Sequence, residues 1–281
     1  MRIHTLICGC MRPFGGALWD GVTPGLGAAR LTCRCLLIES EAGLVLVDTG
    51  FGMGDVFDAA NRLDPVFRNA DRVVVKPGDT AHGQIGALGL DPKDVRHIVM
   101  THLDFDHAGG LSDFPWATVH VLAPEAHAAR RRDGAIARAR YRPEQLHTVM
   151  REYDRTSGAR WYGMPAVRDL QGLPEGIVMV PLPGHTAGHC GVAVRTTQGW
   201  LLHAGDAIFN LRELREKPRC PPLAQGYEVL MQVSSRARNQ SQAALRALMR
   251  HHADEVQVIC THDPVADPMP LPAVRGTLAD A

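Results

Sequence analysis

The chain has 281 residues, of which 45% are hydrophobic and 21% are charged, as in an ordinary water-soluble globular protein. Lysine plus arginine and aspartate plus glutamate number 30 each, so no net charge favours nucleic acid or an anionic membrane as a partner. No stretch approaches the roughly 18 apolar residues of a membrane span, and residues 1–16 lack the apolar core of a signal peptide.

The seven cysteines are an odd number scattered along the chain, which does not suit a framework of disulfides. We therefore expect a reducing, cytoplasmic setting. Most of the thiols should be buried as small apolar groups. The cysteines are Cys8, Cys10, Cys33, Cys35, Cys190, Cys220 and Cys260.

Short apolar runs that end at turn signals predict several β-strands. The runs 35–40 and 44–50 predict two strands joined by a turn, and Asp91 before Pro92 is typical of a helix start. Further strands are expected within 97–102, 117–124, 176–185, 191–206 and 255–262. One helical stripe is expected within 240–252, formed by Ala244, Leu245, Leu248 and Met249. This mixed order predicts an α/β protein in which helices cover sheets.

The segment 125–170 differs from the rest of the chain by its arginine content, and helical stretches are expected in it. One interpretation is a solvated helical face, which we expect for most of these arginines. The other is a helical lid that recognises an anionic substrate group through arginine. The arginines within its stretch 125–163 are Arg130, Arg131, Arg132, Arg138, Arg140, Arg142, Arg151, Arg155 and Arg160.

A histidine or an aspartate follows directly after four of the predicted strands. Loops at the ends of strands commonly converge to form functional sites. One such residue alone would more often be a structural histidine, but four in the same context point to a metal site. These residues are His102, His185, Asp206 and His262.

The stretch "THLDFDHAGG" (101–110) places two histidines and two aspartates within six consecutive positions. In an extended loop His102, Asp104 and Asp106 would face the same side. His107 breaks this alternation and needs a turn, for which the glycines at 109–110 leave room. The stretch is therefore the centre of the predicted metal site.

With these residues the sequence resembles the metallo-β-lactamase superfamily. The matching segments arrive in the order and with the spacing of the family, from about residue 30 to about residue 265. The resemblance implies an αβ/βα four-layer sandwich of two mixed β-sheets flanked by helices, in a single domain over 1–281 with a helical lid at about 125–170. The segments are "VDTG" (47–50), "THLDFDHAGG" (101–110), "GHTAGH" (184–189), "GD" (205–206) and "THDP" (261–264).

The resemblance implies seven ligands for two divalent metal ions, three for each ion and one that bridges them. In that order they are His102, Asp104 and His185; Asp106, His107 and His262; and Asp206. A metal-bound hydroxide would act in catalysis together with Asp106 and Asp206. His189 and Asp48 would support the ligands by hydrogen bonds rather than bind metal. Zinc is the expected ion.

Two positions depart from the pattern of the family. Asp104 stands where a histidine is usual, which gives the site three carboxylates rather than two, lowers its positive charge and opens it to Mn or Fe. The alternative is that Asp104 only forms a hydrogen bond with a neighbouring histidine or a structural water. Phe209 stands where the lactonases carry a tyrosine.

The segments "GHTAGHCG" and "THDP" resemble the glyoxalase-II and acyl-homoserine-lactonase branches of the superfamily more than the true β-lactamases. We therefore expect a hydrolase that cleaves an ester, lactone or thioester of a small molecule. The alternatives are an iron-dependent oxidoreductase, a phosphodiesterase and a non-catalytic metal-binding scaffold. Tyr227 and His203 are candidates for the proton donor, although each is expected to be structural, and residues 211–222 are a pocket wall or a homodimer contact.

Overall fold

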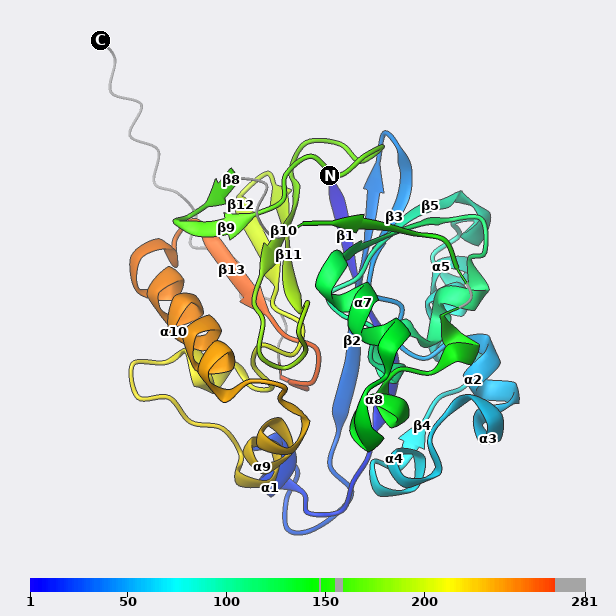
Figure 1. Cartoon of the computed structure of the whole chain (residues 1–281), viewed down its shortest axis with the longest axis vertical. Coiled ribbons are helices and arrows are strands. Elements are labelled where there is room, and N and C mark those ends of the chain that lie inside the picture. The colour runs from blue at the N-terminus through cyan, green and yellow to red at the C-terminus, as the bar shows by residue number, and fades with distance from the viewer. Residues whose placement is uncertain (147, 155–158, 266–281) are drawn as a thin grey trace.

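The computed structural model describes residues 1–146, 148–154 and 159–265, so Arg155 lies outside the described residues. Two β-sheets lie side by side at the centre, with helices around them (Figure 1). The larger sheet has the order β4 (Val73–Val74), β1 (Arg2–Met11), β2 (Leu31–Ser40), β3 (Gly43–Val47), β5 (Val95–Val99), β6 (Thr118–Leu122) and β7 (Met150–Tyr153). The smaller has the order β10 (Ile177–Pro181), β11 (Cys190–Thr196), β12 (Gly199–His203) and β13 (Val256–Ile259).

Both sheets mix antiparallel and parallel pairs. In the larger sheet β4, β1, β2 and β3 pair antiparallel, whereas β3, β5, β6 and β7 pair parallel. In the smaller sheet β10, β11 and β12 pair antiparallel, and β13 joins β12 in parallel. The parallel pairs matter for function because they bring the carboxyl ends of neighbouring strands to one edge.

The helices are short except for α9 and α10, and α10 is the longest. They are α1 (Ala17–Asp20), α2 (Met53–Phe57), α3 (Ala59–Arg62), α4 (Pro65–Ala70), α5 (Ala81–Ala87), α6 (Phe105–Ala108), α7 (Ala123–Arg131), α8 (Gly134–Arg140), α9 (Pro222–Met231) and α10 (Ser235–His252). Turns of 3₁₀ helix are η1 (Pro77–Asp79), η2 (Pro92–Asp94), η3 (Gly109–Asp113), η4 (Pro143–Gln145) and η5 (Leu211–Leu214). Among the described residues no helix is both long and apolar enough to cross a membrane.

Three apolar clusters divide the molecule into four layers. Side chains of β2, β3 and β5 meet those of β10, β11 and β12 between the two sheets. The other face of the larger sheet packs against α5 and α7, and the other face of the smaller sheet packs against α10. Helix, sheet, sheet and helix therefore follow one another, which confirms the predicted αβ/βα sandwich.

Most expected elements are present, with differences that have local causes. The strand expected over 44–50 ends at Val47 because Asp48 adopts a left-handed backbone with φ of 57°. Asp91 accepts a hydrogen bond from the Lys93 amide as expected, but the helix it begins is only the turn η2. Strand β1 has no counterpart among the predicted elements. In α10, Leu245 and Leu248 are buried as predicted.

The arginine-rich segment 125–170 contains more than helices. Helices α7 and α8 occupy its first part, and β7 then adds an edge strand to the larger sheet. The hairpin β8 (Ala159–Trp161) and β9 (Met164–Ala166) follows. All seven cysteines are free thiols, and five of them are buried, as the sequence predicted.

Candidate metal centre

The residues predicted as ligands meet at one edge of the two sheets. His102 and Asp104 lie in the loop after β5, which leads directly into α6 with Asp106 and His107. Each of the other three follows a strand of the smaller sheet, and all seven are at most 5% exposed. These three are His185 after β10, Asp206 after β12 and His262 after β13. Four strand ends thus bring seven buried polar side chains together.

The first group of side chains consists of His102, Asp104 and His185, whose potential ligand atoms lie within 4.8 Å of one another. Asp104 Oδ2 is 3.0 Å from His185 Nε2 and 3.6 Å from His102 Nε2. Two imidazole nitrogens and one carboxylate at this spacing form a donor set that zinc, manganese or iron can use.

The second group consists of Asp106, His107 and His262, again with potential ligand atoms within 4.8 Å. Asp106 Oδ2 lies 3.5 Å from His262 Nε2 and 3.7 Å from His107 Nε2. The turn that His107 requires is the first turn of α6, which begins at Phe105.

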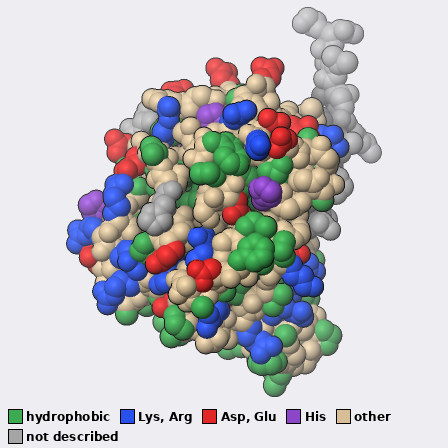
Figure 2. Space-filling model, turned by 90° about the vertical axis from the view of Figure 1, so that its right-hand side faces the viewer, with side chains coloured by type: hydrophobic (Ala, Val, Ile, Leu, Met, Phe, Trp, Pro, Cys, Tyr) green, Lys and Arg blue, Asp and Glu red, His purple; other side chains and the backbone are tan. Residues whose placement is uncertain are grey.

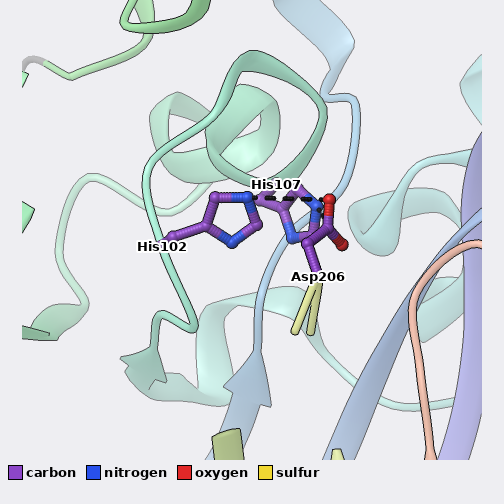
Figure 3. Close-up of side chains that lie close together, drawn as sticks. All are labelled: His102, His107 and Asp206. Carbon is purple, nitrogen blue, oxygen red and sulfur yellow. Dashed lines mark ion pairs between the residues drawn. The ribbon is translucent and has the colours of Figure 1, made fainter. Parts of the chain in front are cut away.

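Asp206 lies between the two groups. Its Oδ1 is 3.3 Å from His107 Nε2, and its Oδ2 is 3.1 Å from His262 Nε2. The same Oδ2 is 3.6 Å from His185 Nε2 and 3.9 Å from His102 Nε2. Figure 3 shows His102 and His107 both turned toward this carboxylate. Asp206 is thus placed as a bridge between the two groups.

Several polar atoms of the cluster are buried without a hydrogen-bond partner among the described residues. They are Nε2 of His102, Nε2 of His107, Oδ1 of Asp104 and Oδ1 of Asp206. Burying such atoms unpaired is costly, and native proteins seldom do so without an ion, a water or a function. The donor set and its unpaired atoms therefore fit divalent metal ions.

Asp48 fixes two parts of the metal-binding loop at once. Its Oδ1 accepts the Thr101 amide at 2.7 Å, and its Oδ2 accepts the Thr101 hydroxyl at 2.7 Å. Oδ2 also lies 2.8 Å from His107 Nδ1. Burial raises the pKa of Asp48, but the adjacent His107 outweighs it and holds the pKa below its ordinary value. An ionised Asp48 therefore orients His107 with Nε2 toward the cluster.

His189 contacts the cluster through the backbone of Asp206. Its Nδ1 lies 3.0 Å from the Leu182 carbonyl oxygen, and its Nε2 accepts the Asp206 amide at 2.9 Å. Burial lowers the pKa of His189 well below its ordinary value, which keeps the ring neutral. With both nitrogens bonded to backbone, His189 is placed to position Asp206.

The pKa values of the three carboxylates of the cluster are shifted in different directions. Burial raises the pKa of Asp104 and of Asp206, but neighbouring cations and imidazoles outweigh it and hold both values well below the ordinary range. For Asp104 the largest of these neighbours is the Arg140 guanidinium. The pKa of Asp106 is raised, first by burial and then by the two other carboxylates against the effect of the histidines. Mutual repulsion of this kind is relieved by bound cations.

Two buried residues of the arginine-rich region contact the cluster but were not predicted from the sequence. Arg140, at the end of α8, places Nη2 3.2 Å from Asp104 Oδ2. Glu125, in the first turn of α7, accepts the Leu103 amide at 3.1 Å and the Gly188 amide at 3.0 Å. Glu125 lies just after β6, so the strand-end pattern could have identified it. Arg140 had no such signal among its neighbouring arginines.

Aromatic side chains cover the cluster on one side. The Phe209 ring lies 4.9 Å from the His262 ring and 6.1 Å from the Tyr227 ring, measured between centroids. The Tyr227 hydroxyl donates to Asp71 at 3.2 Å. His203 bonds at both nitrogens with backbone groups, the Arg34 carbonyl oxygen and the Gly205 amide. His203 therefore has a structural role, as expected.

Comparisons with known proteins agree with this arrangement. The sequence model of the metallo-beta-lactamase superfamily matches residues 28–256. A probable metallo-hydrolase of Mycobacterium bovis is 38% identical over 94% of this chain and 81% of its own length. The N-acyl homoserine lactonase AttM of Azorhizobium caulinodans is 30% identical over 69% of this chain and 68% of its own.

Solved structures give the same fold. A mutant of Bacillus thuringiensis AiiA with N-decanoyl-L-homoserine at its active site superposes with a TM-score of 0.65 and 21% identity, covering 93% of each chain. A probable metal-dependent hydrolase from Staphylococcus aureus has a TM-score of 0.66 and 19% identity, covering 93% of this chain and 89% of its own.

Proposed function

The chain belongs to the metallo-beta-lactamase superfamily, and we propose that it is a hydrolase with two divalent metal ions that cleaves an ester, lactone or thioester of a small molecule. One observation carries the proposal: seven buried ligand-type residues form two adjacent groups around Asp206, with unpaired polar atoms in both groups. The relatives that are named metallo-hydrolase and N-acyl homoserine lactonase support the same reaction class.

Each residue of the cluster has its own role in the proposed metal site. His102, Asp104 and His185 would hold one ion, Asp106, His107 and His262 the other, and Asp206 both. When bound, the two ions, for which zinc is the first expectation, would lower the pKa of a water molecule and polarise the substrate carbonyl. Asp106 and Asp206 would orient that water through their carboxylate oxygens. Asp48 would hold His107 in position, and His189 would hold Asp206 in position.

A cavity that Arg140 connects to the cluster, and that none of the seven ligand-type residues lines, supports a small molecule with an apolar part as the substrate. Its volume is about 560 Å³, and its mostly apolar lining comes from α7, α8 and α9 and the segment after α9. Arg140 lines the cavity and also contacts Asp104. A volume of this size suits a small organic ligand. The position of α7 and α8 over the cluster also supports their assignment as a lid.

The face of the molecule in Figure 2 gives no support to a nucleic acid as the substrate. On the face in Figure 2, basic and acidic side chains are interspersed, and hydrophobic side chains lie between them. A nucleic-acid interface would be expected to present a continuous basic stripe.

The test is hydrolysis of a panel of lactones, aryl esters and thioesters by protein loaded with zinc, manganese or iron. We expect turnover that a chelator abolishes and added metal restores. His185→Gln should lose it, whereas His251→Gln, at the exposed end of α10, should keep it. No turnover across the panel with two metals bound would contradict the proposal. One bound iron with oxygen consumption would favour the oxidoreductase instead.

A further inference from the structure

Arg140 is a buried cation that contacts two of the residues assigned as metal ligands. Its side chain is 1% exposed at the end of α8. Nη2 lies 3.2 Å from Asp104 Oδ2 and donates to the Met231 carbonyl oxygen at 3.0 Å. Nη1 donates to the backbone oxygen of His185 at 3.2 Å. The guanidinium is thus fixed by the end of α9 and by the loop that carries His185, and it faces the first ligand group.

The two oxygens of Asp104 have different surroundings. Oδ2 lies next to both Arg140 and His185. Oδ1 is buried and has no hydrogen-bond partner among the described residues. Arg140 therefore approaches the same oxygen, Oδ2, that lies nearest to the two histidines of the first ligand group.

We propose that Arg140 is a positioning residue which pairs with Asp104 and makes a carboxylate workable at this ligand position. The proposal rests on the proposed metal site. The guanidinium offsets the negative charge that Asp104 adds beyond Asp106 and Asp206. The charge of the loaded site with Arg140 counted therefore equals that of a site with histidine at position 104 and no arginine beside it. With the pair present, the loaded site should lower the pKa of its bound water as strongly as a site with histidine at position 104 would. This favours hydrolysis over redox chemistry.

The pairing predicts that either partner alone is harmful, because a buried charge without its counterion is strongly destabilising. Asp104→His would leave the Arg140 guanidinium facing an imidazole and two metal ions. Adding Arg140→Met would remove that unpaired cation, and histidine could then bind metal without repulsion. The two substitutions should therefore compensate each other.

The test is a double-mutant cycle on the full chain, with zinc affinity measured by competition with a chromophoric chelator. We expect Asp104→His to weaken zinc binding about tenfold or more in the presence of Arg140. The same substitution should weaken it less than about threefold in the Arg140→Met background. The visible spectrum of the cobalt-loaded protein should change with Arg140→Met, since the coordination by Asp104 changes.

Two further variants keep the test decisive. Arg138→Met removes an exposed arginine from the same helix, and in that background the penalty of Asp104→His should be unchanged. Arg140→Gln replaces Arg140→Met if the methionine variant does not fold. An equal penalty in all backgrounds would overturn the pairing even if hydrolysis is intact. Absence of hydrolysis in the zinc-loaded native chain would instead overturn the proposed function and leave the result of the cycle standing.

Discussion

Among the described residues, two clusters of mostly buried ligand-type side chains differ in how their polar atoms are bonded. In the cluster around Asp206, several nitrogens and oxygens have no hydrogen-bond partner among the described residues. In the second cluster, Glu213, Cys220 and Glu228 also have potential ligand atoms within 4.8 Å of one another. There, however, Glu213 accepts two backbone amides, those of Phe209 and Asn210, at 2.9 Å each.

The carboxylate of Glu228 in the second cluster is also bonded. It pairs with Arg238 at 2.9 Å, and Gln242 donates to Glu213 at 3.2 Å and to Glu228 at 3.4 Å. Burial and the neighbouring Glu213 raise the pKa of Glu228 to about 9, against the lowering effect of Arg238. Proximity of carboxylates and a thiol therefore does not by itself make a metal site. The proposed metal site differs in that donor atoms without hydrogen-bond partners converge there, whereas the second cluster holds the loop after Asp206.

The largest predicted effect is a loss of bound metal and activity on substitution in the cluster around Asp206, and not on substitution in the second cluster. Asp206→Asn removes the bridging charge while it keeps the shape of the side chain. It should lower kcat/KM on the order of 10³-fold and leave fewer than two ions per chain, because ion binding supplies most of the rate enhancement. Elemental analysis and initial rates measure both effects. Cys220→Ser should keep two ions and full activity, and a loss of metal from that variant would refute the distinction.

Metal removal should destabilise the fold through the first cluster only. A ligand present at about a thousand times its Kd stabilises the folded state by about 4 kcal/mol, and a chelator should remove that amount from the free energy of unfolding. Urea unfolding with and without chelator measures it. The difference should be the same in Cys220→Ser and much smaller in Asp206→Asn. An equal difference in Asp206→Asn would show that the ions bind elsewhere.

A smaller effect is expected where a residue only orients a ligand. Asp48→Asn weakens the contact with His107 Nδ1 without touching the metal. Zinc affinity should fall about 10- to 100-fold, as for other residues that support a metal ligand. Competition with a chelator measures this. Asp91→Asn makes the same chemical change at the exposed start of η2 and should leave the affinity unchanged. An unaltered affinity in Asp48→Asn would argue against the orienting role.

The last effect concerns the pH dependence of stability and belongs to the second cluster. The raised pKa of Glu228 means that the folded state keeps a proton which the unfolded state has released. Its contribution to the free energy of unfolding is therefore fully present below about pH 4.5 and is lost as pH rises toward 9. Glu228→Gln should reduce this slope by at most about 1.4 kcal/mol per pH unit. Urea unfolding of the metal-free chains at pH 6 and 8 measures the slope, and parallel curves for the two proteins would contradict the raised pKa.

The ligand positions could be predicted from the sequence because the determining feature is local. His102 follows an apolar strand of the larger sheet, and His185, Asp206 and His262 each follow an apolar strand of the smaller sheet. These four strands end at the same edge of the sandwich. The sandwich itself followed from the same strands together with the family resemblance. Strand β1 was not predicted, although it is the second strand of the larger sheet and pairs with β2 along most of its length.

The residues that support the ligands were harder to predict because their partners are distant in sequence. Arg140 is one of several arginines in a short segment, and only the packing of α8 against the loop that carries His185 buries it. Glu125 likewise joins Leu103 to Gly188, two residues on loops of different sheets. Sequence patterns locate side chains along an element, but they do not show which loop will lie beside it.

The metal content of the purified native chain, measured by elemental analysis together with hydrolysis of a lactone, tests the central claim most directly. The account predicts two divalent ions per chain, with hydrolysis that is lost when they are removed and regained when they return. A single iron with no hydrolysis, or hydrolysis that persists in chelator without any bound metal, would contradict it.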